Sequence, residues 1–287
     1  MTKLHVIAGP TACGKTAAAI ELAKQTNGEV VSADSMQVYI GMDIGTAKPT
    51  TEEMDGVPHH LIDVVKPDEP FSVAEYVALA NEAIKDIAGR GKTPILAGGT
   101  GFYINAVIYG AVFEEQEDKK DNELRLFYTE LAKEQGGSFL HEKLQKLDPI
   151  SAAAIHVNNV KRVIRALSYC ESTGGLFSEH NKKQKEKAPQ YDVDFRLINI
   201  PREILYERIN ARVLQMWDAG LAAEAQGLLD SGYHPSLTAM QGIGYKEVMP
   251  YLNGEQIKED AISQIQQATR NYAKRQDTWF RHQLRRG

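Results

Sequence analysis

The chain has 287 residues, of which 43% are apolar and 25% charged, and its net charge is −5. This is the composition of an ordinary globular protein, too long for one small core. No apolar run approaches the ~20 residues of a membrane span, and the apolar run near the N-terminus is too short for a signal peptide. The two cysteines, Cys13 and Cys170, argue against a disulfide or zinc scaffold and predict a reducing cytoplasm.

Lys3–Ala8 is typical of a short buried strand, and Lys15–Gln25 has the composition and apolar spacing of a helix. Between them, "GPTACGKT" (9–16) fits the pattern G-x-x-x-x-G-K-S/T without a mismatch. In such a loop backbone N–H groups surround phosphate oxygens, the lysine reaches the outer phosphates, and the hydroxyl binds Mg²⁺. The order strand, loop, helix therefore predicts a phosphate site.

Further strands are expected to alternate with helices along the chain. A helix is expected at 72–88, and the expected strands are "EVVSA" (29–33), "HLIDVV" (60–65), "TPILAGG" (93–99) and "DFRLINI" (194–200). This alternation predicts an α/β fold with a parallel, doubly wound sheet that binds ligands at the carboxyl ends of its strands. With the phosphate loop, it predicts a P-loop NTPase-like core flanked by helices.

Residues 113–190 contain no convincing strand. They open with acidic residues and close in a polar, lysine-rich loop, with helices expected at 121–135, 138–147 and 159–172. We expect a helical insertion subdomain, which would form a lid or grip a substrate, within a core made of 1–112 and 191–287. The end of this core is expected to be almost entirely helical, at 202–218, 220–231 and 255–285.

Positive charge is concentrated in short stretches. Residues 270–287 carry +5, which leaves −10 on the other 269 residues, and "VKRVIR" (160–165) and "NKKQKEK" (181–187) are also basic. Basic patches on an acidic body are typical of binding to a specific polyanion. Charge alone, however, favours solvent-exposed helix faces.

Three polar residues follow predicted strands and are candidates for chemistry. Asp34 either points into the cleft or caps a turn, and its position alone does not separate these alternatives. Gln37 has the paired donor and acceptor that read an adenine edge, although a single glutamine is usually a surface residue. Thr100, in "GGTGFY" (98–103), presents a hydroxyl to the cleft, where the glycines allow close approach of a ligand or form a tight turn.

Other candidates have plainer interpretations. His59 and His60 are adjacent, so their side chains diverge in a strand and are expected to be structural. Arg208 and Arg212 share a helix face and either bind phosphate or pair with acids such as Glu224. In the last helix, helical spacing predicts that one set of side chains packs inward: Tyr272, Gln276, Trp279, Phe280, Gln283 and Leu284.

Taken together, the motifs resemble those of the bacterial tRNA dimethylallyltransferases (tRNA isopentenyltransferases, the IPP transferase family). The resemblance runs from Val6 to Arg281 and rests on "GPTACGKT", "DSMQVY", "GMDIGTAKPT", "PHHLID", "GGTGFY", "NNVKRVIRALSYCESTG", "QGIGYKE" and "AKRQDTWFR". The chain departs from the family at Cys13, where serine is usual, and in its short tail.

The resemblance implies transfer of a dimethylallyl group from dimethylallyl diphosphate to the exocyclic amine of an adenosine. That adenosine lies 3′ of the anticodon in tRNAs that read codons beginning with U. Phosphate is then held as the leaving group, with Asp34 as the general base, Thr100 as a positioning group and Arg212 assisting departure. The implied diphosphate ligands are Gly9, Thr11, Ala12, Cys13, Gly14, Lys15 and Thr16, with Mg²⁺ bound through Thr16.

The resemblance also implies a monomer that holds a tRNA anticodon stem-loop, gripped by the insertion at 113–190. The implied tRNA-binding residues are Asp34, Ser35, Met36, Gln37, Thr100, Lys161, Arg162, Arg165, Gln241, Gly242, Gly244, Lys246, Lys274, Arg275 and Arg281. Two alternatives use the same loop. A small-molecule or nucleoside kinase would use Asp34 to deprotonate an acceptor hydroxyl, and a non-catalytic RNA-binding NTPase switch would need no carboxylate in the cleft.

Overall fold

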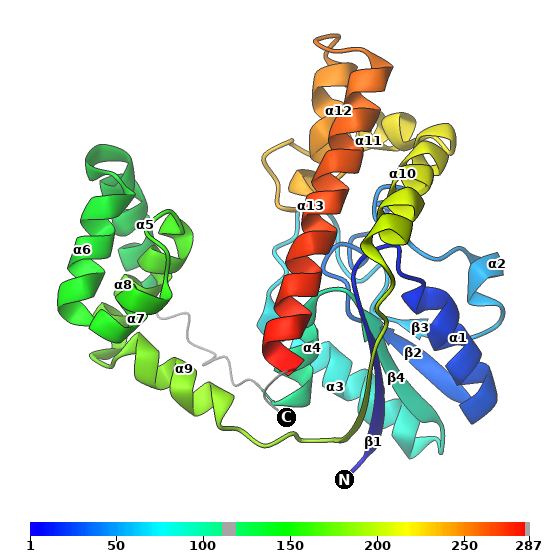
Figure 1. Cartoon of the computed structure of the whole chain (residues 1–287), viewed down its shortest axis with the longest axis horizontal. Coiled ribbons are helices and arrows are strands. Elements are labelled where there is room, and N and C mark those ends of the chain that lie inside the picture. The colour runs from blue at the N-terminus through cyan, green and yellow to red at the C-terminus, as the bar shows by residue number, and fades with distance from the viewer. Residues whose placement is uncertain (111–118, 285–287) are drawn as a thin grey trace. The chain divides into compact units, whose positions relative to one another are not determined.

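The computed structural model describes residues 1–110 and 119–284 (Figure 1). The chain divides into two compact units: a core unit of Met1–Gly110 with Pro189–Gly287, and a helical unit of Ala111–Ala188. The acidic stretch "EEQED" (114–118), together with Arg285 and Arg286, lies outside the described residues.

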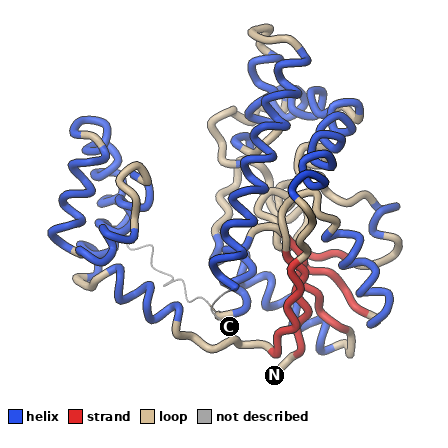
Figure 2. Tube along the Cα trace, in the orientation of Figure 1, coloured by secondary structure: helices blue, strands red, loops and turns tan. Residues whose placement is uncertain are grey.

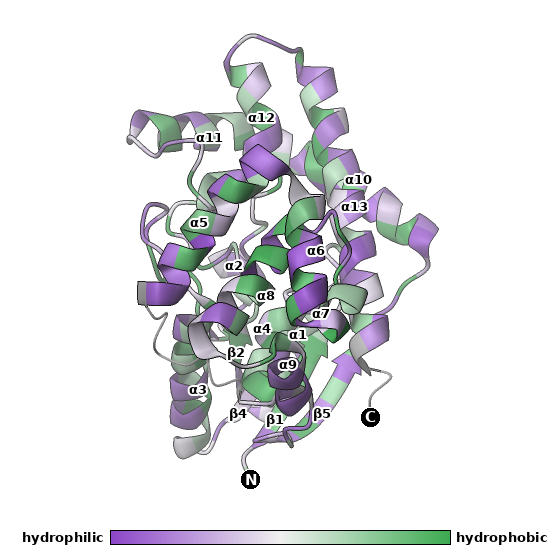
Figure 3. Cartoon of the chain, turned by 90° about the vertical axis from the view of Figure 1, so that its left-hand side faces the viewer, coloured by the Kyte–Doolittle hydropathy of each residue, from purple (hydrophilic) through white to green (hydrophobic). Residues whose placement is uncertain are grey.

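The core unit is built on a parallel sheet (red in Figure 2). Within the described residues it has five strands, in the order β3-β2-β4-β1-β5. Along the edge strand β5, polar and apolar residues alternate (Figure 3), whereas the inner strand β1 is almost entirely buried, as a parallel strand covered on both faces must be. The predicted α/β class is therefore confirmed. The strands are β1 (Lys3–Ala8), β2 (Gly28–Ser32), β3 (His59–His60), β4 (Thr93–Gly98) and β5 (Asp192–Leu197).

Helices α1 (Lys15–Thr26), α3 (Val73–Gly89) and α4 (Gly101–Ile108) pack on this sheet, and the short α2 (Thr51–Met54) lies in a connection. Helix α1 buries Ala19, Ile20, Leu22 and Ala23 in a cluster with strand residues such as Val30 and Ile95. Helix α3 begins where the sequence signals it, because Ser72 and Glu75 form a reciprocal capping box.

The rest of the core unit is helical. It consists of α10 (Arg202–Asp218), α11 (Leu221–Asp230), the 3₁₀ turn η1 (Ala239–Gln241), α12 (Tyr245–Leu252) and the long α13 (Lys258–Leu284). These helices share an apolar cluster with Val38, Tyr39 and Met42 from the loop after β2. That loop is thereby fixed against the helices by burial of apolar side chains.

The helical unit comprises α5 (Lys119–Gln135), α6 (Gly137–Leu147), α7 (Pro149–Ala154), α8 (Val160–Thr173) and α9 (Phe177–Lys185). Tyr128, Leu140 and Leu167 are among the residues of its own apolar core. The buried Asp148 caps α7 and also accepts hydrogen bonds from Ser151 and Ser178, which ties α9 to the unit. No helix in the described part of the chain is long and apolar enough to cross a membrane.

Two expectations about secondary structure are wrong. The predicted strand at 60–65 stops at His60, because Leu61 and Asp63 take left-handed backbone angles (φ 62° and 56°) that turn the chain out of the sheet. The lysine-rich segment expected as a loop is largely helix α9, which the bond from Ser178 N–H to Asp148 anchors at its start. Helices α7 and α12 were not expected.

Candidate active site

The glycine loop joins β1 to α1 and ends in a helix N-terminus without a side-chain cap. Gly14 is the N-cap residue, with a left-handed φ of 97°, and Ala12 is also left-handed at 62°. The N–H groups of Lys15 and Thr16 open α1, where the helix has no preceding carbonyl to receive them. A left-handed non-glycine residue beside free helix N–H groups is typical of a pre-formed anion site.

Gly9 and Cys13 are held by close packing. A Cβ on Gly9 would lie 2.7 Å from the Ile198 carbonyl oxygen and 2.8 Å from Cys13 Sγ. The Cys13 thiol is buried in an apolar cluster with Leu205 and Ile209. The side chain at this position therefore faces the protein interior, so cysteine in place of serine leaves the phosphate side of the loop unchanged.

Part of the loop is already bonded within the protein. The Thr11 N–H donates to Gln276 Oε1 at 2.8 Å, and the Cys13 N–H approaches the Pro10 carbonyl at 3.4 Å. Lys15 Nζ donates to the Pro10 carbonyl at 2.7 Å. The N–H groups of Lys15 and Thr16 are therefore better placed to receive an anion than the N–H of Thr11.

Cations gather around the loop. Burial lowers the pKa of Lys15, and the positive charge of Arg212 lowers it further. Cys13 and Asp34 act in the opposite direction but do not cancel the effect of burial. Burial also lowers the pKa of Arg212. Arg208 lies one helical turn before Arg212. Its Nη1 is 3.9 Å from the position that a Cβ added to Gly14 would take, so this guanidinium group also lies beside the loop. A bound anion would offset this concentration of positive charge.

A cavity of about 330 Å³ opens beside the loop within the core unit. Its polar wall includes Lys15, Thr16, Asp34 and Arg212. Its apolar lining comes from α1, β2, α10 and α13, and includes Ala19, Val30, Ile209, Val213, Met216 and Ile265. The cavity thus combines polar groups that suit phosphate with apolar side chains.

Asp34 both caps a turn and lines the cavity, so the two interpretations of this residue are compatible. Its Oδ1 accepts the Met36 N–H at 2.9 Å, which fixes the orientation of the carboxylate. Thr100 is not among the cavity-lining residues. Its Oγ1 accepts the Ser35 N–H at 3.1 Å, so it holds the turn that carries Asp34.

The glycines around Thr100 allow close approach of other parts of the protein. A Cβ on Gly98 would overlap Ala33, one on Gly99 would overlap Gln276, and one on Gly101 would overlap Trp279. The sequence suggested a ligand or a tight turn as the reason for these glycines. The structure shows that they allow the close approach of Ala33, the residue after β2, and of helix α13.

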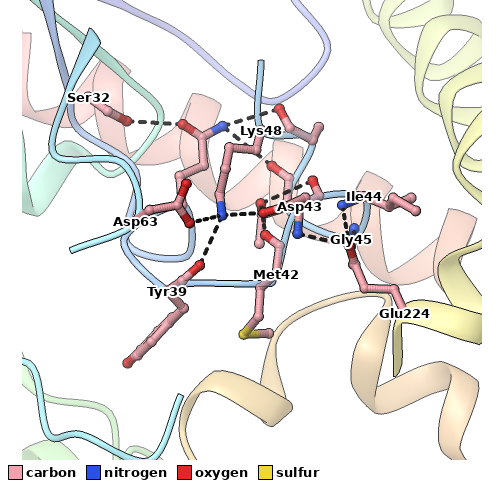
Figure 4. Close-up of polar contacts among 12 residues, drawn as sticks. Ser32, Tyr39, Met42, Asp43, Ile44, Gly45, Lys48, Asp63 and Glu224 are labelled. Atoms are coloured by element: carbon pink, nitrogen blue, oxygen red, sulfur yellow. Dashed lines mark hydrogen bonds and ion pairs between the residues drawn. The ribbon is translucent and has the colours of Figure 1, made fainter. Parts of the chain in front are cut away.

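The loop after β2 lines the cavity through Gly45, Thr46, Ala47 and Pro49. Its polar contacts are drawn in Figure 4. Gln37 accepts a hydrogen bond from Ser32 Oγ at 3.0 Å and donates to the carbonyls of Thr46 and Ala47, so its amide is bonded within the protein. The nearly buried Lys48 donates to the Tyr39 carbonyl and pairs with Asp43 and Asp63 at 2.5 and 2.6 Å. These bonds link distant parts of the loop to one another and to the end of β2.

Glu224 on α11 holds the same loop through its backbone. Its carboxylate accepts the N–H groups of Asp43, Ile44 and Gly45 at 2.8–3.0 Å (Figure 4). It also accepts a hydrogen bond from the hydroxyl of the buried Tyr245 at 2.6 Å. The suggested pairing of Glu224 with Arg208 or Arg212 is therefore wrong, because the carboxylate is occupied by these donors.

We expect Glu224→Ala to lower the free energy of unfolding by about 2 kcal/mol or more, because it leaves several backbone donors without their charged acceptor. Thermal denaturation should show this as a Tm decrease of about 4–8 °C. Glu207→Ala, at an exposed position on α10, is the matched control and should change the Tm little. A Glu224→Ala protein as stable as this control would contradict the role.

The two histidines have structural contacts. His60 Nε2 lies 2.7 Å from Glu29, a buried carboxylate that Arg90 and Lys92 also contact and whose pKa they lower. His59 lines the cavity, with Nδ1 2.9 Å from the Val57 carbonyl, and burial lowers its pKa. Among the described residues, no group of three histidine, cysteine or acidic side chains could hold a metal.

A family model described as IPP transferase matches residues 37–283. The chain belongs to the IPP transferase family. The family expected from the motifs is thus confirmed, and the phosphate loop precedes the matched region. Curated relatives named tRNA dimethylallyltransferase match across nearly the whole chain. The protein from Lachnoclostridium phytofermentans is 48% identical, covering 99% of this chain and 90% of its own, and that from Bacillus pumilus is 50% identical, covering 97% and 86%.

Solved structures agree with this assignment. A tRNA isopentenylpyrophosphate transferase from Bacillus halodurans is 47% identical and matches with a TM-score of 0.70 over 98% of this chain and 87% of its own. A eukaryotic dimethylallyltransferase acting on tRNA is 32% identical and matches with a TM-score of 0.83 over 98% of this chain and 70% of its own.

Apart from Thr100, the residues that the IPP transferase resemblance assigned to tRNA fall into three groups. Gln241, Gly242, Gly244 and Arg275 line the cavity with Asp34, Ser35, Met36 and Gln37. Lys246, Lys274 and Arg281 are exposed on α12 and α13, where Arg281 pairs with Asp277 at 2.9 Å. Lys161, Arg162 and Arg165 are exposed on α8 of the helical unit.

Sequence reasoning missed several residues of this candidate site. Tyr272 was expected only to pack inward, but it lines the cavity and hydrogen bonds with Thr100 and Gln276. Burial, followed by the negative charge of Asp34, raises the pKa of Tyr272 to about 12. Glu224, Lys48 and Gln276 were assigned no role as positioning groups. Only the motifs "GMDIGTAKPT" and "AKRQDTWFR", which contain Lys48 and Gln276, could have drawn attention to them.

Proposed function

We propose that the chain transfers a dimethylallyl group from dimethylallyl diphosphate to the exocyclic amine of the adenosine 3′-adjacent to the anticodon. The acceptors are tRNAs that read codons beginning with U. The observation that carries the proposal is the opening of a phosphate loop and a strand-end carboxylate onto one partly apolar cavity, in a member of the IPP transferase family. The family assignment favours this reaction over the kinase alternative.

The donor half of the site stabilises a departing diphosphate. Breaking the allylic C–O bond places negative charge on the diphosphate. The N–H groups at the start of α1, together with Lys15 and Arg212, would stabilise that charge. Thr16 supplies a hydroxyl oxygen of the kind that Mg²⁺ prefers and lines the same cavity, so it would hold the ion. Bound there, Mg²⁺ would add positive charge beside the leaving group.

The apolar part of the cavity suits the dimethylallyl group. Side chains such as Val213, Met216 and Ile265 cannot hydrogen bond, so they exclude water from the carbon at which the bond breaks. Water reaching that carbon would compete with the amine and hydrolyse the donor.

The acceptor half activates a weak nucleophile. The exocyclic nitrogen of adenine has its lone pair delocalised into the ring, so attack is assisted by removal of a proton. Asp34 is oriented by the Met36 N–H and retains further lone pairs with which to accept that proton. Thr100 acts through Ser35, by fixing the turn that carries the carboxylate.

The tRNA would meet basic residues on both units. The target adenosine must leave the stacked anticodon loop to enter the cavity. We assign Gln241, Gly242, Gly244 and Arg275 to its path, and the exposed Lys161, Arg162 and Arg165 on α8 to the anticodon stem-loop backbone. The protein would act as a monomer in the cytoplasm, where tRNA is found.

We expect Arg162→Glu and Arg275→Glu to weaken tRNA binding. Each should flatten the dependence of log affinity on log salt by roughly one unit per lost phosphate contact. Filter binding across a salt series measures both effects. Lys133→Glu, on α5 beside Glu130, is the control and should leave the slope unchanged. Unaltered slopes in the two arginine variants would mean that these residues only face solvent.

The acceptor is tested with synthetic anticodon stem-loops. Incubation with the protein and dimethylallyl diphosphate should add one dimethylallyl group, located by nuclease digestion and mass spectrometry at the adenosine 3′ of the anticodon. Replacing that adenosine with guanosine should abolish the addition. Modification at another adenosine, or of the guanosine stem-loop, would contradict the proposal.

A further inference from the structure

Gln276 links helix α13 to two distant parts of the core unit. Its side chain is almost completely buried, at 6% exposure. Oε1 accepts the N–H of Thr11 in the phosphate loop at 2.8 Å, and Nε2 donates to the Gly99 carbonyl at the end of β4 at 2.9 Å. One amide thus joins the loop assigned to the donor and the turn beside Thr100.

Neighbouring residues on α13 seat the helix on the same turn. Tyr272, one helical turn earlier, hydrogen bonds with Thr100, and Trp279 lies against Gly101. A Cβ on Gly99 would overlap the Gln276 amide, so glycine is required there for the helix to approach this closely. The junction between α13 and this turn therefore depends on pairs of residues that fit each other: Gln276 with Gly99, and Trp279 with Gly101.

The chemistry of the junction requires both ends of an amide. The backbone of Thr11 offers a donor and that of Gly99 an acceptor, and glutamine provides the complementary pair at the required length. A carboxylate would satisfy Thr11 but face the Gly99 carbonyl with a second acceptor. A thioether of similar length would satisfy neither.

Another side of α13 is exposed and basic. Lys274 and Arg275 are exposed and share a surface hollow with Asn271, Thr278, Trp279 and His282. Arg275 also lines the cavity. A single helix thus presents one face to the proposed tRNA surface and, through Gln276, fixes the phosphate loop with the other.

We propose that Gln276 is a positioning residue for the transfer reaction. It sets the phosphate loop relative to the turn of Ser35 and Thr100, so the electrophilic carbon of the donor is held at the right distance from the Asp34 carboxylate. The helix that carries Gln276 is also the one that we expect tRNA to contact. Gln276 itself touches neither reacting atom. The inference rests on the proposed function, and misplacement of reacting groups by about 1 Å can cost about 10²-fold in rate.

The first test compares Gln276→Met with Gln267→Met, which alters an exposed glutamine on the same helix. We expect Gln276→Met to lower the single-turnover rate at least about tenfold, while the tRNA dissociation constant changes less than about twofold. Gln267→Met should match the wild type in both. A Gln276→Met rate within about twofold of the wild type, or a loss of tRNA affinity equal to the loss of rate, would overturn the inference.

The second test uses Gln276→Glu, because a protonated carboxyl group has the donor and acceptor arrangement of an amide. The ratio of variant to wild-type rates should rise from about pH 8 to about pH 5, as the introduced carboxyl gains a proton. Groups that the two proteins share affect the ratio little, and Tyr272 stays neutral because its pKa is about 12. A ratio that does not change with pH would overturn the inference.

A binding measurement separates this inference from the proposed function. Calorimetry with inorganic diphosphate should show weaker binding to Gln276→Met than to Gln267→Met, whether or not a prenyl group is transferred. A wild-type protein that forms no prenylated tRNA would refute the proposed function alone. Equal diphosphate affinities in the two variants would refute the role of Gln276 alone.

Discussion

Asp34→Asn is expected to lower the single-turnover rate of transfer by about 10²–10⁴-fold, the usual contribution of a positioned acid–base group. The asparagine keeps the shape of the side chain and an oxygen that can accept the Met36 N–H. It cannot take the proton from the adenine amine. Binding of diphosphate and of tRNA should therefore survive nearly intact, and Asp34→Ala should be no more active.

The control for Asp34 is Asp68→Asn, in an exposed turn, which should leave the rate unchanged. A pH–rate profile adds an independent criterion. If proton removal limits the rate, the acidic limb of the wild-type profile should vanish in Asp34→Asn. Near-normal single-turnover transfer by Asp34→Asn would show that the residue only caps its turn and that the base lies elsewhere.

Lys15→Ala is expected to lower transfer by about 10²–10³-fold, comparable to removing one preorganised donor from a site of developing negative charge. Its ammonium group lies at the phosphate loop, bonded to the Pro10 carbonyl in the free protein. A diphosphate would provide a stronger acceptor. Because tRNA is expected to contact other residues, its affinity should fall much less than the rate.

Lys24→Ala is the matched control for Lys15, since Lys24 lies on the same helix and pairs with Asp55. It should retain wild-type transfer. Filter binding with tRNA then tests the division of the site into donor and acceptor halves. A loss of tRNA affinity in Lys15→Ala as large as its loss of rate would contradict that division.

The features that could be predicted from the sequence are those encoded by residues close together in the chain. The phosphate loop is one, because its glycines, lysine and threonine lie within eight positions. The start of α3 is another, because Ser72 and Glu75 cap it locally. Asp34 could be located because carboxyl ends of parallel strands share one edge of the sheet, which brings β2 near the loop after β1.

The missed features depend on contacts between distant residues. Glu224 reaches the backbone of Asp43 across 181 positions, and Gln276 reaches Thr11 across 265. No local pattern signals that a helix residue will bond a remote backbone group. The apolar run at 60–65 was misleading for a different reason. Left-handed residues within it end the strand, and hydrophobic spacing carries no information about backbone handedness.

Gln37 illustrates the limit for single side chains. Its residue type suggests base recognition, but the fold uses its amide to join Ser32 to the carbonyls of Thr46 and Ala47. Any contact between this amide and a base would need those bonds to be exchanged. The type of a residue identifies which bonds it can make, and only the packing around it decides which are made.

The most direct test of the central claim, that the loop holds a leaving diphosphate, follows both parts of the donor in one reaction. Dimethylallyl diphosphate labelled with a carbon isotope in the allyl group and a phosphorus isotope in the diphosphate is incubated with the wild-type protein and tRNA, beside a reaction with ATP labelled in its terminal phosphate. The account predicts carbon label in tRNA, an equal amount of phosphorus label released as diphosphate, and no transfer from ATP. Phosphate passing from ATP to an acceptor, with no carbon label in tRNA, would contradict it.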